Sequence, residues 1–599
     1  MCGIVGYLGG SSAAAQPVLF DLLKRLEYRG YDSAGIAVMN GSIQVLKTKG
    51  SVNNLMSETP ILRGCCGIGH TRWATHGKPS SKNAHPHCCD TNKIAVVHNG
   101  IIENYIEIRD KLIDLGHKFR SETDTEVLPH LIEENYNNDL ESSVRQALSM
   151  VRGSYALAAI SSNDPDKIVV ARKDSPLVLG LGETGFFIAS DVSGILKYTK
   201  DVIFLNDREL AVISHNGIEI TTLDGKKVDK KIETIKWNAE SAEKSGYPHF
   251  MLKEIFEQPD VIRETFSGRM SAEGVDLEVV MPDARRIIIT ACGTSYHAGL
   301  FGRYVIERFA RIPVNVEIAS EFRYINPIVN SSDLVIGITQ SGETADTLAA
   351  VREVNLEKSQ KFGIVNVPGS SITRESQCLF TRAGPEIGVA ATKSFTSQLA
   401  VLLLLAVQLG RARKEMSTAD ANDFVYDLKQ MSGNIQRVLN EADNIKKCAL
   451  VFADADQFLF MGRGANYPIA LEGALKLKEI SYIKAEGFPA GELKHGPLAL
   501  IYDGVPVVAI ATEGVTYEKM LGNIKEIKAR GATVIGIANE SDTKIEKYVD
   551  RVLRIPDSNP WISPVLSSVV LQLFAYYVAD YKGCEIDKPR NLAKSVTVE

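Results

Sequence analysis

The chain opens with the stretch MCGIVGY at residues 1–7, which decides how its first part is built. The apolar run at residues 4–7 is typical of a β-strand, and such a strand would hold the thiol of Cys2 in one place. Removal of Met1 would leave Cys2 with a free α-amine beside its own sulfur. An α-amine titrates near about 7.7–8.0 and a thiol near about 8.5, so one residue could supply both nucleophile and base. The alternative is a structural strand that happens to begin with cysteine.

Short apolar segments follow this strand throughout residues 1 to about 220. Because strands come in groups, the pattern favours stacked antiparallel sheets between helices over a doubly wound sheet. We expect strands at residues 2–8, 35–39, 66–70, 94–98, 155–160, 168–171 and 186–189. We expect helices at residues 17–27, 103–115, 124–135 and 140–151.

Three polar motifs stand at the ends of these predicted elements. GHTRWATHG at 69–77 supplies Arg72, whose guanidinium can hold an α-carboxylate with two hydrogen bonds. In HNG at 98–100, Asn99 and the Gly100 N–H could face an oxyanion, although Asn-Gly is also a common turn. In SETDTE at 121–126, Asp124 could cap a helix or bind a substrate ammonium.

Taken together, these motifs resemble the glutaminase domain of class II amidotransferases, which use an N-terminal nucleophile. The resemblance rests on CGIVG at 2–6, EYRGYDSAG at 27–35, HTRWATHG at 70–77, HNG at 98–100 and SETDTE at 121–126. It implies a four-layer αββα fold at residues 2–220, with Cys2 as nucleophile and its α-amine as base. It further implies an oxyanion hole formed by Asn99 and Gly100, and Trp73 as the gate to an ammonia channel. The implied glutamine site consists of Arg72, Thr75, His76 and Asp124.

The remainder of the chain is internally duplicated after a charged linker at residues 221–250. Residues 286–295, 334–344 and 362–367 align with segments about 170 residues further along, at 458–465, 506–516 and 534–539. Each segment is a strand followed by a loop, so we expect two doubly wound parallel α/β domains. Their predicted bounds are 278–418 and 449–589, followed by a tail at 590–599.

A phosphate site is predicted in the first copy only. TQSGET at 339–344 ends a strand and opens a helix, where hydroxyls and free N–H groups form a seat for an anion. CGTS at 292–295 adds two hydroxyls, whereas the second copy carries RGA at 463–465 and EGV at 513–515 instead. Neither of these two loops carries a Walker lysine or a GxGxxG motif, which favours one phosphate on a small molecule over a nucleotide.

Composition excludes several other functions. The chain is 45% hydrophobic and 23% charged with a net charge of -6, as in a soluble cytoplasmic protein, and no basic run suggests nucleic acid. The longest apolar run, residues 400–407, is too short to cross a membrane and predicts a buried helix. The nine cysteines are scattered without a CxxC pair, so we expect reduced, packed thiols apart from Cys2. The charge balance also argues against a non-enzymatic sugar-phosphate sensor that regulates transcription, because such a protein would need a helix-turn-helix and a basic face.

The duplicated half resembles a pair of sugar isomerase (SIS) domains, and nearly the whole chain resembles the glucosamine-6-phosphate synthase family. The insertion of eukaryotic members is absent, which implies the bacterial type. The resemblance implies a homodimer that acts on glutamine and fructose 6-phosphate without metal or cofactor. Lys594 would form a Schiff base with the sugar, Glu479 would move a proton with support from Lys476, and His495 of a neighbouring subunit would assist ring opening. The implied contacts of the sugar phosphate are Thr294, Ser295, Thr339, Gln340, Ser341, Thr344, Val389 and Ala593, and the tail would cover the sugar.

Overall fold

The computed structural model describes residues 2–58, 60–74, 76–235, 237, 243–271, 274–277, 284–354 and 360–597. The chain divides into two compact units. The first unit combines Met1–Ala242 with the C-terminal Ala593–Glu599, and the second is Glu243–Leu592.

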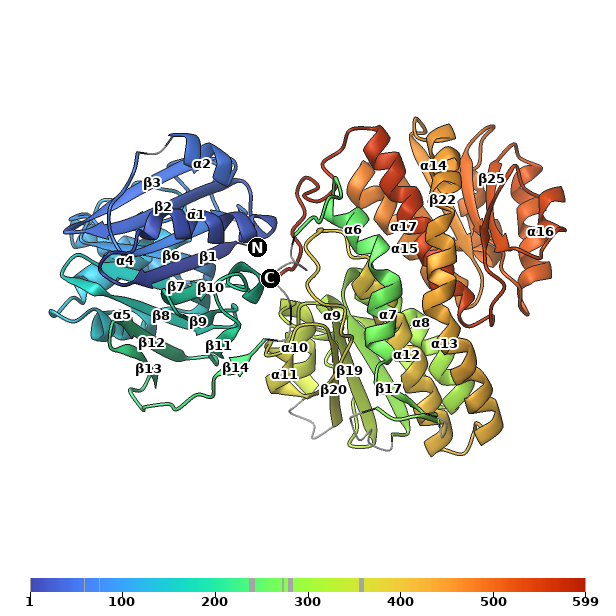
Figure 1. Cartoon of the computed structure of the whole chain (residues 1–599), viewed down its shortest axis with the longest axis horizontal. Helices are drawn as coiled ribbons and strands as arrows, with labels where there is room; N and C mark the ends of the chain where they lie inside the picture. Colours follow the sequence, from blue (N-terminus) through green and yellow to red (C-terminus); the bar gives the residue numbers. More distant parts are fainter. Residues whose placement is uncertain are drawn as a thin grey trace. The chain divides into compact units, whose positions relative to one another are not determined.

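Two antiparallel sheets form the centre of the first unit (Figure 1). β1 (Gly3–Gly9) is an inner strand of the larger sheet, between β10 and β4. That sheet has the order β14 (Glu233–Thr234), β11 (Asp201–Phe204), β9 (Val178–Gly182), β10 (Gly185–Ala189), β1, β4 (Cys66–Arg72), β2 (Ser33–Asn40) and β3 (Ser42–Lys49). The other has the order β13 (Gly217–Thr222), β12 (Glu209–Ser214), β8 (Asp164–Lys173), β7 (Gly153–Ser161), β6 (Ile94–Ile102) and β5 (His87–Cys88).

Side chains alternate between the two faces of each strand, so one face of each sheet packs against the other sheet and the opposite face packs against helices. Ile68 of β4 packs into the core between the sheets, together with Val97 of β6. Gly69 faces the opposite way, where an added Cβ would lie 3.2 Å from Leu23 of α1 (Ala15–Leu26), because successive side chains of a strand point to opposite faces. On the outer face of the second sheet lie α3 (Tyr105–Asp114), α4 (Val127–Glu134) and α5 (Leu140–Ser149). This arrangement confirms the predicted αββα fold; the unit also contains α2 (Val52–Glu58).

Of the two roles left open for Asp124, helix capping is not observed. Asp124 lies in the 3₁₀ turn η2 (Asp124–Glu126), and α4 begins only at Val127. Its carboxylate accepts a hydrogen bond from the Ile102 N–H across the sheet edge at 2.9 Å. A tertiary contact has therefore replaced the local one.

The second unit contains two five-stranded parallel sheets with the same strand order. The first has the order β18 (Val314–Ile318), β17 (Arg286–Ala291), β19 (Asp333–Thr339), β20 (Gln360–Val365) and β21 (Gln377–Phe380). The second has the order β23 (Lys484–Pro489), β22 (Gln457–Gly462), β24 (Pro506–Ile510), β25 (Thr533–Asn539) and β26 (Arg551–Ile555). The predicted pair of doubly wound domains is confirmed.

Helices cover both faces of these sheets. The first copy has α8 (Gly293–Ala310), α9 (Ala319–Phe322), α10 (Ala345–Glu353), α11 (Ile372–Glu375) and α12 (Lys393–Ala412). The second has α15 (Asn466–Ser481), α16 (Tyr517–Lys528) and α17 (Ser563–Tyr581), and Figure 1 shows α16 on the opposite side of the sheet from α15 and α17. The unit also contains α6 (Phe250–Phe256), α7 (Gln258–Phe266), α13 (Thr418–Asn440), α14 (Ala442–Val451) and the short strands β15 (Met270–Ser271) and β16 (Gly274–Val275).

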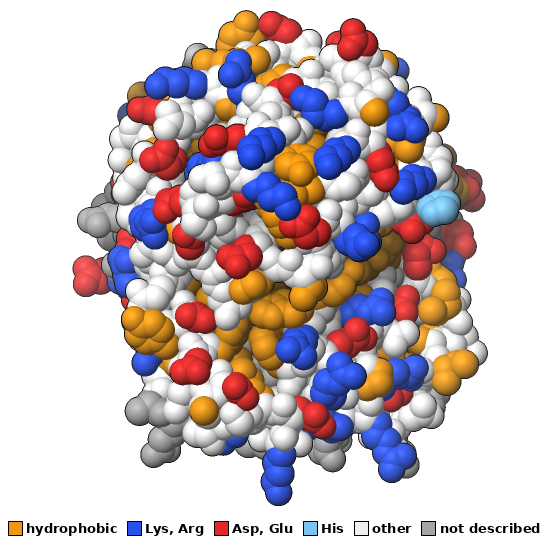
Figure 2. Space-filling view, turned by 90° about the vertical axis from the view of Figure 1, so that its right-hand side faces the viewer, with side chains coloured by type: hydrophobic (Ala, Val, Ile, Leu, Met, Phe, Trp, Pro, Cys, Tyr) orange, Lys and Arg blue, Asp and Glu red, His pale blue; other side chains and the backbone are white. Residues whose placement is uncertain are grey.

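Helix α12 contains the longest apolar run of the sequence. It is the one helix among the described residues with the length and hydropathy of a membrane span, and 83% of that window is buried in the protein. The predicted buried helix is confirmed. Figure 2 shows acidic and basic side chains intermixed over the face that it draws, in keeping with the small net charge.

Candidate active sites

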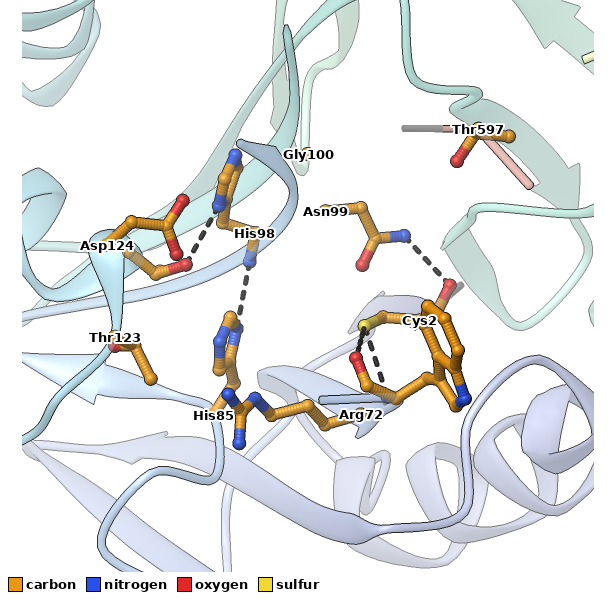
Figure 3. A pocket seen from close by; sticks show the side chains of 11 residues that line it. Cys2, Arg72, His85, His98, Asn99, Gly100, Thr123, Asp124 and Thr597 are labelled. Atoms are coloured by element: carbon orange, nitrogen blue, oxygen red, sulfur yellow. Dashed lines mark hydrogen bonds between the residues drawn. The ribbon is translucent and has the colours of Figure 1, made fainter. Parts of the chain in front are cut away.

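The thiol of Cys2 lies at one wall of a pocket in the first unit (Figure 3). Its Sγ atom is 3.3 Å from the backbone nitrogen of Trp73 and 3.4 Å from the carbonyl oxygen of the same residue. The carbonyl oxygen of Cys2 accepts hydrogen bonds from Asn99 Nδ2 at 2.9 Å and Arg29 Nε at 3.3 Å. The pocket and its opening to solvent together contain about 460 Å³ of space not filled by atoms. The start of β1 is therefore anchored from two sides while the sulfur faces a cavity.

His70 orients the Asn99 side chain. Its Nε2 atom lies 3.0 Å from Asn99 Oδ1 and 3.1 Å from the carbonyl oxygen of His98. Both are acceptors, so this nitrogen carries the proton. Burial lowers the pKa of His70 to about 3, which keeps the ring neutral. The amide of Asn99 is thus held with its NH₂ group toward Cys2. The sequence analysis gave His70 no role, although it stands in the motif that contains Arg72.

A strained backbone position lies next to Asn99. Gly100 has a φ of 129°, and a Cβ added there would lie 2.1 Å from the Ser154 carbonyl oxygen. Only glycine fits, because an L side chain would be strained in φ and would collide with β7. Gly100 therefore brings bare backbone to the pocket wall.

Of the four residues expected to hold glutamine, Arg72 and Asp124 line the Cys2 pocket. Arg72 is 3% exposed and donates to the carbonyl oxygens of His76 and Gly77. Its other terminal nitrogen, Nη1, has no hydrogen-bond partner within the described part of the chain, which leaves it available for a carboxylate. His76 is half-buried and holds Arg72 through its backbone, whereas Thr75 lies outside the described residues.

The C-terminal tail reaches the same pocket. Thr597 is 4% exposed and is one of the lining residues. Ala593 and Lys594, which the sequence analysis assigned to the sugar site, are half-buried and belong by their contacts to this first unit. Their position over the sugar remains a prediction.

In the second unit, hydroxyl groups gather where β19 ends. Thr339 Oγ1 lies 2.9 Å from Thr344 Oγ1 and accepts from the Gly342 N–H at 3.2 Å. Ser341 Oγ accepts from the N–H of Glu343 at 3.1 Å. The Glu343 carboxylate accepts from both the N–H and the hydroxyl of Ser371, at 2.8 and 2.7 Å. The loop before α10 is therefore shaped by its own side chains, as an anion seat requires.

Helix α15 of the second copy brings a buried charge cluster to the first copy. Lys476, 1% exposed, lies 3.3 Å from Glu472 Oε1 and 2.6 Å from Glu479 Oε2, and it donates to Thr294 Oγ1 at 3.2 Å. Glu472 also binds Thr294 at 3.0 Å and His297 Nδ1 at 2.7 Å. Burial would lower the pKa of Lys476, but Glu472 and Glu479 outweigh it and raise that pKa. The cluster thus contains a lysine that stays charged, positioned beside a half-exposed glutamate.

The sequence analysis missed Glu472 and His297. The spacing of Glu472, Lys476 and Glu479, three and four residues apart, is the signal that could have revealed the first, since these positions share one helix face. No sequence signal identifies His297, because only packing of α8 against α15 brings it to Glu472.

The other predicted sugar-site residues also make contacts within this unit or lie on its surface. Ser295, in the first turn of α8, accepts from Gln398 Nε2 at 3.0 Å, and the Gln340 carbonyl oxygen accepts from the Asn366 N–H at 3.1 Å. Val389 donates its N–H to the Asp587 carbonyl oxygen at 3.1 Å. His495 is exposed at the end of the 3₁₀ helix Ala490–His495.

The second copy uses the equivalent loops differently. Arg463 donates to Asn523 Oδ1 at 3.0 Å, and the hydroxyl of Thr512 accepts from Asn466 Nδ2 at 2.8 Å. The loss of the hydroxyl set predicted from the sequence thus coincides with hydrogen bonds between side chains of the same domain.

Comparisons with known proteins identify the families of the two halves of the chain. The SIS domain family matches residues 281–408 and 451–579, and the glutamine amidotransferase domain family matches residues 70–197. Over the full length of both chains, this protein is 55% identical to the glutamine--fructose-6-phosphate aminotransferase [isomerizing] of Methanosarcina acetivorans and 48% identical to that of Thermus thermophilus.

A solved structure covers the second half. The C-terminal domain of glucosamine-fructose-6-phosphate aminotransferase from Francisella tularensis is 38% identical, with a TM-score of 0.55, over 58% of this chain and 99% of that one. The full-length identities are far above what a shared fold alone would give. The chain belongs to the glutamine--fructose-6-phosphate aminotransferase [isomerizing] family.

Proposed function

We propose that this protein converts glutamine and fructose 6-phosphate into glutamate and glucosamine 6-phosphate, the first step toward amino sugars. The observation that carries the proposal is the pocket around Cys2, with its anchored thiol and oriented Asn99 amide, in a chain that also contains an SIS pair. The glutaminase half supplies ammonia and the SIS half consumes it.

In the glutaminase half, the Cys2 thiolate attacks the δ-carbonyl carbon of glutamine after loss of Met1. Its α-amine takes the thiol proton and returns it to the departing ammonia, and water then hydrolyses the thioester to glutamate. Asn99 and the Gly100 N–H stabilise the oxyanion. Arg72 binds the α-carboxylate, Asp124 binds the α-ammonium, and His76 and Thr75 complete the site.

In the sugar half, the phosphate occupies the seat formed by Thr339, Gln340, Ser341 and Thr344, with Ser295, Val389 and Ala593 nearby. Lys594 forms an imine with the C2 carbonyl of the opened sugar and is displaced by ammonia. Glu479 moves a proton from C1 to C2, which converts the ketose imine into the amino aldose. Lys476, held by Glu472 and bonded to Thr294, keeps Glu479 in place.

Ammonia must cross between these steps without contact with water, because ammonium has no lone pair to attack a carbonyl. We propose that Trp73, whose backbone contacts Cys2 Sγ, forms the gate of this passage. The enzyme is a cytoplasmic homodimer in which His495 of one subunit serves the sugar site of its neighbour. The domain bounds are those proposed from the sequence, with residues 590–599 over the sugar.

The test combines labelling with two variants. A glutamine-mimicking electrophile should form one adduct, on a peptide that begins with Cys2, and should form it faster when fructose 6-phosphate is present. Cys2→Ala should abolish use of glutamine but retain sugar isomerisation. Lys594→Arg should show the reverse, with slow glutamine hydrolysis remaining.

Two results would contradict the proposal. An adduct on another cysteine would make Cys2 a structural residue. Loss of isomerisation in Cys2→Ala, in a protein with unchanged circular dichroism, would mean that the two sites are not chemically separate.

A further inference from the structure

Two histidines on the outer side of the first unit face each other. His117 follows α3 and His130 lies within α4, and their Nδ1 atoms are 3.2 Å apart. Asp90 Oδ2 lies 3.7 Å from the first of these atoms and 4.0 Å from the second. Glu133 Oε2 lies 3.8 Å from His117 Nδ1. Three segments distant in sequence therefore direct two imidazoles and two carboxylates toward one point.

These separations match a tetrahedral metal ion. Bonds of about 2.0–2.2 Å from zinc to nitrogen or oxygen place tetrahedral ligand atoms roughly 3.3–3.6 Å apart. The three ligand atoms of His117, His130 and Asp90 all lie within 4.8 Å of one another. Closing the group onto an ion would require shifts of only a few tenths of an ångström in side chains.

The opposite ring nitrogen of His117 supports the same interpretation. His117 Nε2 lies 3.2 Å from Glu134 Oε2, whereas His130 Nε2 lies 3.9 Å from Glu126 Oε1, beyond hydrogen-bond distance. Histidines that bind a metal commonly donate their other N–H to a carboxylate. With both protons on Nε2, the two Nδ1 lone pairs point at each other, which only a shared cation or a proton can make favourable.

The group of side chains is largely buried but can be reached from solvent. The His130 side chain is 1% exposed, and its Nε2 has no hydrogen-bond partner among the described residues. Asp90, at 29% exposure, leaves a route from solvent, and its Oδ2 also accepts from the backbone N–H of Lys118 at 2.9 Å. The two ligating carboxylates would neutralise a divalent charge.

We propose that His117, His130, Asp90 and Glu133 bind one divalent transition-metal ion of the zinc class. Two imidazoles favour such ions over magnesium or calcium, which prefer oxygen ligands. The role is structural. Glu126, beside His130, also accepts from the N–H groups of Arg120 and Ser121. The ion would thus fix α4 and the turn that carries Asp124 into the Cys2 pocket.

Metal binding to the full-length, chelator-stripped protein tests the proposal. Zinc should bind at one equivalent per chain in competition with a chromophoric chelator, and cobalt should give the intense visible absorption of a tetrahedral site. His117→Gln and Asp90→Asn should abolish this equivalent. His215→Gln, which changes an exposed histidine 3.6 Å from Asp166, should retain it. Glu134→Gln should weaken binding about 10- to 100-fold.

The catalytic thiol is the main competing ligand, so binding is repeated in Cys2→Ala. Zinc that is lost in Cys2→Ala but retained in His117→Gln would overturn the proposal, as would the absence of a stoichiometric equivalent in the unmodified protein. Zinc should also raise the melting temperature of the wild type and not that of His117→Gln. Circular dichroism shows whether each variant is folded before it is measured.

Discussion

The two SIS copies share a backbone plan but differ in what their first helix buries. Gly302 of α8 and Gly473 of α15 occupy equivalent positions: an added Cβ would lie 2.9 Å from Leu402 in the first copy and 2.7 Å from Leu571 in the second. When the two glycines are aligned, Phe301 and Val305 of α8 correspond to Glu472 and Lys476 of α15, in that order. All four are buried.

The difference shows how a duplicated fold divides its work. In α8 these positions are apolar and serve only the core. In α15 they are an ion pair whose charges reach Thr294 of the first copy. A buried pair costs desolvation that apolar residues avoid, so we attribute its presence to the chemistry of the sugar. In the proposed function, the first copy contributes the phosphate seat and the second contributes the charged groups.

The largest effect should come from breaking the pair in α15. Lys476→Met leaves the Glu472 carboxylate buried without its main partner and should cost about 3–5 kcal/mol of unfolding free energy. Replacing both residues by those of the first copy, as Glu472→Phe with Lys476→Val, should restore most of that stability but no sugar reaction. Urea unfolding measures the stability of each variant, and separate assays of glutamine hydrolysis and of the sugar reaction measure its activity. A Lys476→Met protein as stable as wild type would contradict it.

Two equivalent threonines, one in each SIS copy, allow the loops before α10 and α16 to be compared by mutation. Thr344 and Thr516 precede α10 and α16, are half-buried, and neither side chain caps its helix. Thr344→Ala removes a hydrogen bond to a charged phosphate, worth about 1.5–3 kcal/mol, and should raise the KM for fructose 6-phosphate about 10- to 150-fold. Thr516→Ala should leave that KM unchanged. Equal increases in both variants would remove the distinction between the copies.

Mutation of the two equivalent glycines should show that α8 and α15 pack against their neighbouring helices in the same way. Gly302→Ala and Gly473→Ala each force a methyl group against a leucine, and overpacking of this kind costs about 1–3 kcal/mol. We expect similar decreases in unfolding free energy, measured in urea. If only one variant is destabilised, the two helices do not approach their neighbours in the same way.

The smallest effect concerns pH. Burial would raise the pKa of Glu472, but Lys476, His297 and Thr294 outweigh it and lower that pKa. The stabilisation is present above the unfolded value of about 4.3 and is lost as pH falls through the lower folded pKa. The Glu472→Phe, Lys476→Val protein should therefore lose less stability than wild type between about pH 5 and about pH 3. If urea titrations showed the same change in unfolding free energy with pH for both proteins, this prediction would be contradicted.

Local pattern was enough to predict seven of the fourteen strands described in the first unit, namely β1, β2, β4, β6, β7, β8 and β10. Residues 94–98 and 155–160 were predicted because apolar and β-branched residues dominate them, and they lie in β6 and β7. The prediction omitted β3 and β13, whose residues are mostly exposed or half-buried. Such strands depend on hydrogen bonds to a neighbour rather than on a continuous apolar pattern.

The layers, the duplication and the positions of Cys2, Arg72 and the hydroxyl-rich loops were predictable because each depends on a short-range pattern of residue types. The contacts of His70 with Asn99, of Asp124 with β6 and of His297 with Glu472 appear only in the folded structure. These contacts join residues far apart along the chain. Their energies depend on burial and on distances of about 3 Å, which no local pattern encodes.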